Sequence, residues 1–197
     1  MEQKISLCWF RRDLRLDDQA AFYYALRPGN PVVPVFVFDT NILNDLDDKK
    51  DRRVTFIHEV LEEMQAQLEE QGSSIDVFYG TPEAAFEHWT HKYNVAGVYT
   101  NHDYEPYAKI RDAAVAKQLS KKGISFHSYK DQVILEKDEV LKDNGDPYTI
   151  FTPYSRKWYD TLTFFHLKQY PCKKYYQHLF KQQVIKIPSL REMGFAA

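Results

Sequence analysis

The sequence predicts an α/β fold, a three-layer Rossmann-like domain with a five-stranded parallel sheet, followed by a C-terminal connector. Short runs of apolar, β-branched or aromatic residues alternate with segments of helical periodicity, and strands separated by helices form parallel sheets through right-handed crossovers. The first run is short, mainly apolar and β-prone, as expected for a buried parallel strand. The five runs are residues 5–10, 32–38, 75–79, 96–100 and 125–129.

The helices between these strands place apolar residues three and four positions apart. The clearest helix is expected over residues 52–70, with a glutamate-rich face toward solvent, and another is expected over residues 105–119. Apolar positions of the first are Val54, Ile57, Val60, Leu61, Met64 and Leu68. Those of the second are Ile110, Ala114 and Leu119.

Capping residues indicate where two further helices begin. Asp18 is expected to cap a helix over residues 19–26. Thr81 and Pro82 are typical of an N-cap followed by a proline in the first turn. The helix that starts there has an apolar side made of Ala85, Phe86, Trp89 and Tyr93.

The α/β domain is expected to occupy residues 1–130. A strong turn signal at residues 143–147 and a helix expected over residues 151–162 make residues 131–162 a helical or irregular extension. Residues 163–197 lack clear periodicity, and we interpret them as an interdomain connector. Lysines alternate there with tyrosine and phenylalanine, which would also suit a surface for single-stranded nucleic acid, but a linker whose lysine stems cover aromatic rings is the preferred interpretation.

Composition is typical of a soluble globular protein, for which we expect a cytoplasmic location. Hydrophobic residues make up 44% of the chain and aromatic residues 15%, enough for a sizeable core. No apolar stretch is long enough to span a bilayer, and no secretory signal pattern is present. Cys8 and Cys172 are too few for a disulfide framework and are expected to be free thiols. The net charge of −2 argues against a self-sufficient nucleic-acid binder.

A dense alternation of arginine and aspartate follows the first strand. Arg11, Arg12 and Arg15 interleave with three aspartates over residues 11–18. The carboxyl edge of a central parallel strand is where α/β proteins usually bind ligands. Since the guanidinium groups have carboxylates within reach in the same run, the segment is either a structural lattice of ion pairs or part of a ligand site.

A second polar cluster follows the fourth strand. Asp103 and Glu105 are two residues apart on an extended segment, so both are expected to point the same way, at the same edge of the sheet as Arg11 and Asp39. They can bind hydroxyl or amide donors of a ligand, or pair with Arg53. A loop pinned by ion pairs is the alternative.

Other chemistries find no support in the spacing of residues. The seven glycines form neither a dinucleotide fingerprint nor a phosphate-binding loop. His88 and His91 are three positions apart on a predicted helix, but no third ligand accompanies them, so no metal site is expected. Ser128 and Ser155 lack the flanking glycines of a nucleophile elbow. The sequence therefore nominates no catalytic residue.

Five stretches of the chain match one family pattern in the same order. The first is Trp-Phe-Arg-Arg-Asp-Leu-Arg-Leu-Asp-Asp at residues 9–18. The others are residues 36–39, 101–107, 148–154 with Trp158, and 187–195. Together they resemble the N-terminal, antenna-binding domain of the DNA photolyase and cryptochrome family, and the resemblance covers nearly the whole chain.

This resemblance implies a light-harvesting antenna pigment at the carboxyl edge of the sheet. The Asp-x-Glu-Pro pattern, with an arginine on the second helix, is similar to the type that binds a deazaflavin. Asp103, Glu105 and Arg53 are therefore implied as polar contacts of a deazaflavin or flavin, and Val37 and Phe38 as a wall of its pocket.

Arg11 and Asp39 are expected at the edge of this pocket. Family members that bind a folate antenna instead carry an Asn-Glu pair where this sequence has Tyr107 and Ala108. A folate is therefore less expected than a flavin-type pigment, and a pocket without any pigment stays open as an alternative.

The resemblance further implies that the chain is the N-terminal domain of a deoxyribodipyrimidine photolyase, a carbon-carbon lyase. The complete enzyme would bind reduced FAD in a C-terminal helical domain and use blue light to split pyrimidine dimers in damaged DNA. We expect that domain to be absent from these 197 residues, which we interpret as a fragment without repair activity. A cryptochrome photoreceptor, which signals without repair, has a similar N-terminal half and is the alternative. A stand-alone nucleotide-binding module is a third.

Overall fold

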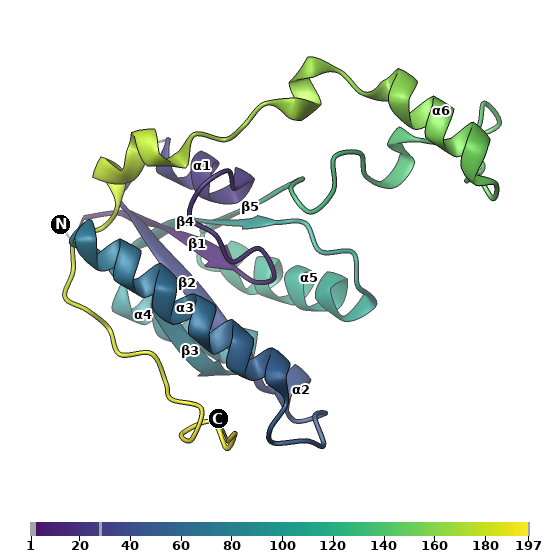
Figure 1. The fold of residues 1–197 in the computed structure, drawn as a ribbon. Helices are drawn as coiled ribbons and strands as arrows, with labels where there is room; N and C mark the ends of the chain where they lie inside the picture. Colours follow the sequence, from purple (N-terminus) through teal and green to yellow (C-terminus); the bar gives the residue numbers. More distant parts are fainter. Residues whose placement is uncertain (1–2, 28, 197) are drawn as a thin grey trace.

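The computed structural model describes residues 3–27 and 29–196. At its centre lies a parallel sheet of five strands in the order β3-β2-β1-β4-β5 (Figure 1). The strands are β1 (Ile5–Phe10), β2 (Val32–Asp39), β3 (Asp76–Gly80), β4 (Val95–Asn101) and β5 (Ser125–Tyr129). The predicted α/β fold is confirmed, and every strand begins and ends within one residue of its expected range.

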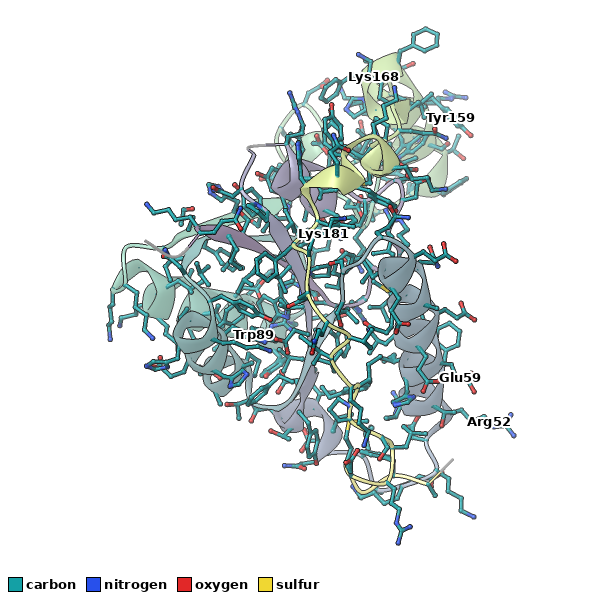
Figure 2. All side chains as sticks on the ribbon, turned by 90° about the vertical axis from the view of Figure 1, so that its left-hand side faces the viewer. Arg52, Glu59, Trp89, Tyr159, Lys168 and Lys181 are labelled. Carbon is teal, nitrogen blue, oxygen red and sulfur yellow. The ribbon has the colours of Figure 1, made fainter. Side chains whose placement is uncertain are left out.

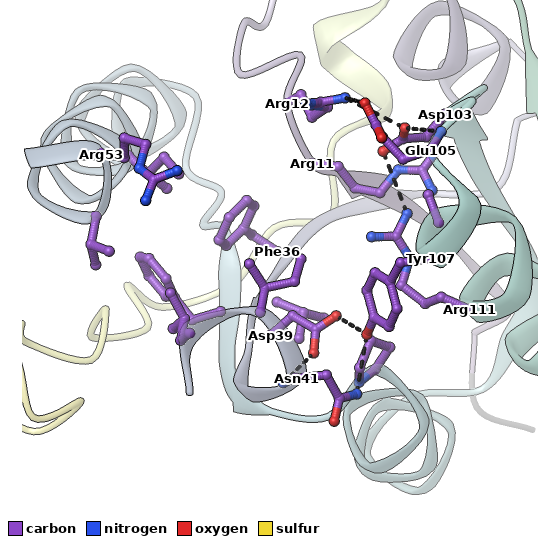
Figure 3. A pocket seen from close by; sticks show the side chains of 18 of the residues that line it. Arg11, Arg12, Phe36, Asp39, Asn41, Arg53, Asp103, Glu105, Tyr107 and Arg111 are labelled. Carbon is purple, nitrogen blue, oxygen red and sulfur yellow. Dashed lines mark hydrogen bonds and ion pairs between the residues drawn. The ribbon is translucent and has the colours of Figure 1, made fainter. Parts of the chain in front are cut away.

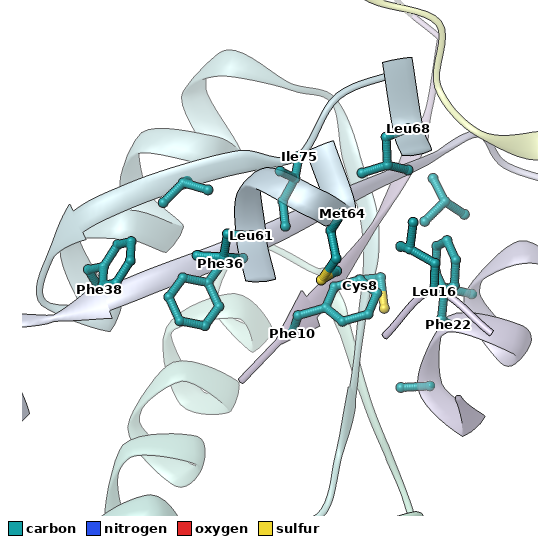
Figure 4. Close-up of a cluster of buried hydrophobic side chains, with 14 of the residues drawn as sticks. Cys8, Phe10, Leu16, Phe22, Phe36, Phe38, Leu61, Met64, Leu68 and Ile75 are labelled. Atoms are coloured by element: carbon teal, nitrogen blue, oxygen red, sulfur yellow. The ribbon is translucent and has the colours of Figure 1, made fainter. Parts of the chain in front are cut away.

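Helices cover both faces of this sheet. The helices are α1 (Ala20–Leu26), the short α2 (Thr40–Leu43), α3 (Arg52–Glu70), α4 (Pro82–Lys92) and α5 (Pro106–Ser120). Cys8 and Phe10 of β1 pack with α1 and α3 on one face (Figure 4). Leu7 and Trp9 pack with α4 and α5 on the other. Successive side chains of a strand point to opposite faces, which explains why every position of β1 except Ser6 is apolar.

Helix α3 follows the predicted amphipathic pattern. Its outer face carries Glu59 and the other glutamates (Figure 2). Its buried residues are Val54, His58, Leu61, Met64, Gln65 and Leu68. The Gln65 side chain accepts a hydrogen bond from the Ile75 backbone at 2.9 Å, which ties the helix to the segment leading into β3. Within the described residues, no helix combines the length and the apolar content needed to cross a membrane.

The expected N-cap of α1 was wrong. The cap is Gln19, whose side chain accepts a hydrogen bond from the Phe22 backbone N–H. Asp18 instead adopts a positive φ of 48° and accepts a hydrogen bond from the Tyr170 backbone at 2.8 Å. The Asp18 carboxylate, which the local sequence predicts as the helix cap, therefore binds the backbone of residue 170 instead.

The expected buried face of α5 was also wrong in part. Ile110 is 71% exposed. The buried residues of this helix are Ala108, Arg111, Val115 and Leu119. The helix thus turns an arginine toward the sheet and an isoleucine toward solvent, which apolar periodicity alone does not anticipate.

Beyond β5 the chain leaves the sheet and then returns. Residues 130–150, with the 3₁₀ turn η1 (Lys137–Glu139), lead to α6 (Phe151–Thr161), which lies away from the sheet (Figure 1). All eleven residues of α6 are described and none of them is buried. A second 3₁₀ turn, η2 (Phe164–Leu167), follows α6.

The return segment packs on the α/β body. It includes the 3₁₀ helix η3 (Cys172–His178), which contacts α1, and Leu179, which forms a parallel bridge with Val32. Cys172 is buried, and both it and Cys8 are free thiols as predicted. Farther along, Met193 and Phe195 are buried as well.

Shortening Leu61 to alanine tests the packing of α3 on the sheet. The Leu61 side chain has no exposed surface, so L61A is expected to lower the free energy of unfolding by about 2–5 kcal/mol. Urea unfolding followed by circular dichroism measures this loss. Glu59→Ala on the exposed face is the matched control and should change stability by less than about 0.5 kcal/mol. Equal losses in the two variants would contradict the assigned helix faces.

Candidate functional site

A pocket of about 670 Å³ opens at the carboxyl edge of the sheet (Figure 3). Its volume falls within the range of about 300–1,000 Å³ that is typical of small-molecule sites. This edge is where parallel α/β sheets usually bind ligands. All seven residues expected at a site line it, namely Arg11, Val37, Phe38, Asp39, Arg53, Asp103 and Glu105.

Two groups of elements form the walls of this pocket. The first wall comes from β1 and from β4 with the start of α5, and the second from the end of β2, α2 and the start of α3. Residues of the first wall are Trp9, Arg11, Arg12, Asp103, Glu105, Tyr107, Ala108 and Arg111. Those of the second include Phe36, Val37, Phe38, Ile42, Leu43, Leu46, Arg53, Val54 and Ile57. The second wall is thus mainly apolar, and the first carries most of the charge.

The Trp9 ring is the centre of the first wall. The guanidinium carbon of Arg11 lies 5.0 Å from the ring centroid and that of Arg111 lies 4.9 Å from it. Both distances are within the range of cation–π contacts. Arg11 also pairs with Asp112 at 2.6 Å and donates to the Asn101 backbone oxygen. Its charge is therefore largely satisfied within the protein.

Arg111 is a buried pocket residue that the sequence did not lead us to expect at the site. It is 7% exposed, and its guanidinium also lies 5.7 Å from the Tyr107 ring centroid. Its Nη2 is 3.0 Å from Asp112 and 3.8 Å from Asp103. Among the groups that the structure describes, however, no acceptor is aligned for a hydrogen bond with this nitrogen. The sequence does contain a signal for this position, because Arg111 shares the helical spacing of Ala108 and Val115, which lie on the buried face of α5.

Tyr107 and Asp39 connect the two walls. The Tyr107 hydroxyl donates to Asp39 at 2.5 Å and accepts from the Asn41 side chain at 3.1 Å (Figure 3). Asp39 also accepts from the Asn41 backbone N–H at 3.0 Å and so caps α2. Partial desolvation, together with the hydrogen bond to the Asp39 carboxylate, raises the pKa of Tyr107 to about 12.

Asp103 and Glu105 lie on the first wall and point toward Arg12. Oxygen atoms of the two carboxylates are 3.6 Å and 3.7 Å from Arg12 Nη1. The Asp103 side chain is 8% exposed and that of Glu105 63%. Asp103 is therefore the better placed of the two for a buried polar contact.

Pairing of these carboxylates with Arg53, one of the two alternatives that the sequence left open, is not formed in the structure. Arg53 lies on α3 across the pocket (Figure 3), and its Nη2 pairs with Asp51 at 2.6 Å. Hydrogen bonds from the Arg53 side chain and backbone lower the pKa of Asp51 to about 2. The side chain of Arg53 is 74% exposed, which leaves this residue at the mouth of the pocket.

The charged turn after β1 is a lattice of ion pairs, but its partners were not the expected ones. Arg11, Arg12 and Arg15 pair with carboxylates from later parts of the chain rather than with aspartates of the same run. These carboxylates are Asp112, Asp103 with Glu105, and Asp131, respectively. Asp13, from within the run, accepts from the Gln19 side chain at 2.8 Å. The turn therefore joins β1 to segments that follow β4 and β5.

The two helix histidines have local contacts in the structure. The His88 ring lies 5.5 Å from that of Phe78, and His91 Nδ1 is 2.8 Å from the Glu87 backbone oxygen. Across the described ranges 3–27 and 29–196, no cluster of three or more candidate ligand side chains is arranged to hold a metal ion.

Comparison with known proteins identifies the family. The family model described as DNA photolyase matches residues 6–174. The chain belongs to the DNA photolyase family. A deoxyribodipyrimidine photo-lyase of Synechococcus sp. is 31% identical over 152 residues, which are 77% of this chain and 31% of the relative. Cryptochromes are also among the relatives of this photolyase-family chain.

Two solved photolyase structures share the fold. A class III photolyase from Agrobacterium tumefaciens matches 79% of this chain and 32% of its own, with a TM-score of 0.69 and 25% identity. An archaeal photolyase from Sulfolobus tokodaii, solved with two FAD molecules that implied a novel light-harvesting cofactor, matches 77% of this chain and 34% of its own, with a TM-score of 0.65 and 31% identity. The present photolyase-family chain thus spans about a third of the length of these proteins.

Replacing Tyr107 with phenylalanine tests its hydrogen bond to Asp39. The pKa of Tyr107 rises from the ordinary value of 10.0 to about 12 in the folded protein, so the protonated hydroxyl stabilises the fold below pH 10. That contribution is lost as the pH rises from 10 toward 12. The stability difference between wild type and Y107F should therefore be constant below pH 10 and shrink above it. Urea midpoints measured between about pH 8 and about pH 11 provide the test.

The Asp39→Asn background is the control for this titration. Its side chain is similar in size but carries no charge, so the same pair of measurements should show a weaker dependence on pH. A difference between wild type and Y107F that does not vary with pH would contradict the assigned hydrogen bond.

Proposed function

We propose that the pocket at the carboxyl edge holds an antenna pigment, either a flavin or a deazaflavin. The observation that carries the proposal is the meeting of all seven expected residues around one cavity of about 670 Å³ in a chain whose residues 6–174 match the DNA photolyase family. In this role the chain would serve as the light-harvesting scaffold of a photolyase.

The shape and polarity of the pocket fit a flat, mainly apolar ring system. Phe36, Phe38 and Leu43 offer an apolar wall, and Trp9 and Tyr107 lie on the other side. Aromatic faces of this kind stack favourably on planar heterocycles. A cavity of this size has room for a three-ring chromophore.

The polar groups at the rim suit the pyrimidine edge of such a ring, which alternates hydrogen-bond donors and acceptors. Asp103 can accept from a ring N–H, and Arg12 beside it can donate to a ring carbonyl. Arg111 Nη2, which lies near Asp112 and Asp103 without an aligned hydrogen bond to a described acceptor, is a further donor behind them. Charges of both signs line the pocket, so it favours a neutral polar ring edge over a strongly charged ligand.

For the complete protein we propose deoxyribodipyrimidine photolyase activity. The named relatives support this proposal, and about two thirds of their length lies outside the part that this chain matches. In such an enzyme, FAD in the helical domain would carry out light-driven repair of pyrimidine dimers in damaged DNA. The pigment site described here would supply excitation energy, and we place the enzyme in the cytoplasm.

A cryptochrome photoreceptor is the second candidate. The observation that favours it is the 26% identity with Cryptochrome-1 of Erithacus rubecula, which extends over 95% of this chain. The photolyase proposal has the stronger support, because the photolyase of Synechococcus sp. is more similar at 31% identity.

The pigment proposal predicts that the purified chain binds FMN or a 5-deazaflavin. Asp103→Asn should weaken that binding by about 1–3 kcal/mol, because it removes the charged acceptor from a buried polar contact. Glu105→Ala should cost less than about 1 kcal/mol, because Glu105 is mostly exposed and exposed ion pairs contribute little. Quenching of pigment fluorescence measures the dissociation constants.

Asp143→Asn, in the exposed turn before α6, is the matched control and should leave the affinity unchanged. Equal affinity in wild type and D103N would remove Asp103 from the site. Failure of wild type to bind either pigment would overturn the pigment proposal itself.

The repair proposal predicts that the 197-residue chain alone does not split pyrimidine dimers under blue light. A chimera in which residues 6–174 replace the matching part of the Synechococcus sp. photolyase should split them, because the two proteins belong to the same family over this region. A damaged oligonucleotide provides the assay, and the unmodified relative is the positive control. Repair by the 197-residue chain alone would contradict the division of labour proposed here.

A further inference from the structure

The outer part of the second pocket wall is a loop, residues 44–51, between α2 and α3. Asp45 and Leu46 of this loop line the pocket. Hydrogen bonds within the loop are local, such as that from the Asp51 backbone to the Asp48 backbone oxygen at 3.2 Å. A wall built on an exposed loop needs contacts from elsewhere to keep one position.

Residues 193–196 provide such contacts at Lys49. The Ala196 backbone N–H donates to the Lys49 backbone oxygen at 2.8 Å. The Lys49 ammonium group lies 5.1 Å from the centroid of the Phe195 ring and donates to the Leu46 backbone oxygen at 3.0 Å. Phe195 is 6% exposed and Met193 is 3% exposed. The end of the connector is thus packed against the loop rather than free in solvent.

The same segment reaches the pocket lining by a second route. His58 Nε2 on α3 is 3.0 Å from the backbone oxygen of Pro188. The His58 ring lies parallel to that of Phe38, a wall residue, at 6.3 Å between centroids and an angle of 28°. In addition, the Tyr79 hydroxyl donates to the Met193 backbone oxygen at 3.3 Å. Residues 187–196 therefore contact both the loop and the helix that carry the second wall.

The first wall has internal anchors of a different kind. Arg11 and Arg111 are held between Trp9 and Asp112 by short ion pairs and ring contacts. The two walls consequently differ in how they are fixed, one by buried charge pairs and the other by a segment distant in sequence. Loss of that segment is expected to loosen one wall and leave the other in place.

We propose that Phe195 is a positioning residue for the pigment site. By packing under Lys49, it holds the loop of residues 44–51 against the pocket and keeps the apolar wall at the spacing that a flat ring requires. The predicted effect of Phe195 on pigment binding rests on the proposed pigment function. The effect on the loop itself does not depend on any ligand.

The test compares two buried connector residues at opposite ends of the sheet. Phe195→Ala removes the contact at the pocket. Leu179→Ala removes a buried side chain at the amino edge, far from the pocket, where the Leu179 backbone bridges to that of Val32. Thermal melting measures the overall loss of stability in each variant. Hydrogen exchange of the backbone amides of residues 44–54 measures loop opening directly.

In F195A, the backbone amides of residues 44–54 are expected to exchange at least roughly fivefold faster than in wild type. L179A, compared at a similar loss of melting temperature, should show no such increase. Phe195→Leu keeps an apolar side chain in place and should restore most of the protection. If F195A leaves exchange in the loop unchanged, or if L179A accelerates it equally, the positioning role is overturned.

Binding of FMN to the same variants separates this inference from the proposed function. F195A is expected to raise the dissociation constant roughly fivefold, with F195L and L179A close to wild type. Equal FMN affinity in wild type and F195A would overturn the positioning of the wall. If wild type binds neither FMN nor a 5-deazaflavin, the pigment proposal fails, and the exchange measurement alone decides whether Phe195 holds the loop.

Discussion

The structure depends on the parallel pairing of β1 with both β2 and β4. Because β1 is central, its carboxyl end is flanked by the ends of two strands that come from different parts of the chain. Polar residues placed just after each strand then meet at one edge of the sheet, although they are up to about a hundred positions apart in sequence. Arg11, Asp39 and Asp103 reach one pocket for this reason.

Buried charge at that edge is tolerated because it is paired. Arg11 and Arg111 are both nearly inaccessible, and both lie beside Asp112 and the Trp9 ring. A buried charge without a partner would cost several kcal/mol, so the ion pairs and the aromatic contact have to form together with the fold. The outcome is a wall in which two arginines are held beside the Trp9 ring by ion pairs.

One part of the chain after β5 packs on the α/β domain and another part does not. Residues 172–196 return to it, bury Cys172, Leu179 and Phe195, and pass from the amino edge of the sheet to the pocket. Helix α6, in contrast, has no buried residue among its eleven, all of them described. The connector is thus part of the packed domain at its end, and the position of the pocket loop depends on residues about 150 positions away.

Much of this protein could be predicted from local sequence. Apolar runs, helical periodicity and capping residues located the five strands and the main helices, because hydrophobic burial at periods of two and 3.6 acts over a few residues. The polar residues that follow the strands likewise predicted that Arg11, Asp39 and Asp103 lie at one edge of the sheet, and the family resemblance added Arg53.

Only the tertiary structure decided which charges pair and which groups face the pocket. Arg53 pairs with Asp51 and not with Asp103. The N-cap of α1 is Gln19 and not the expected Asp18, and Arg111 is buried on α5. Each of these choices depends on distances between segments far apart in sequence, and a charge pairs with whichever partner the packed backbone brings within a few ångströms.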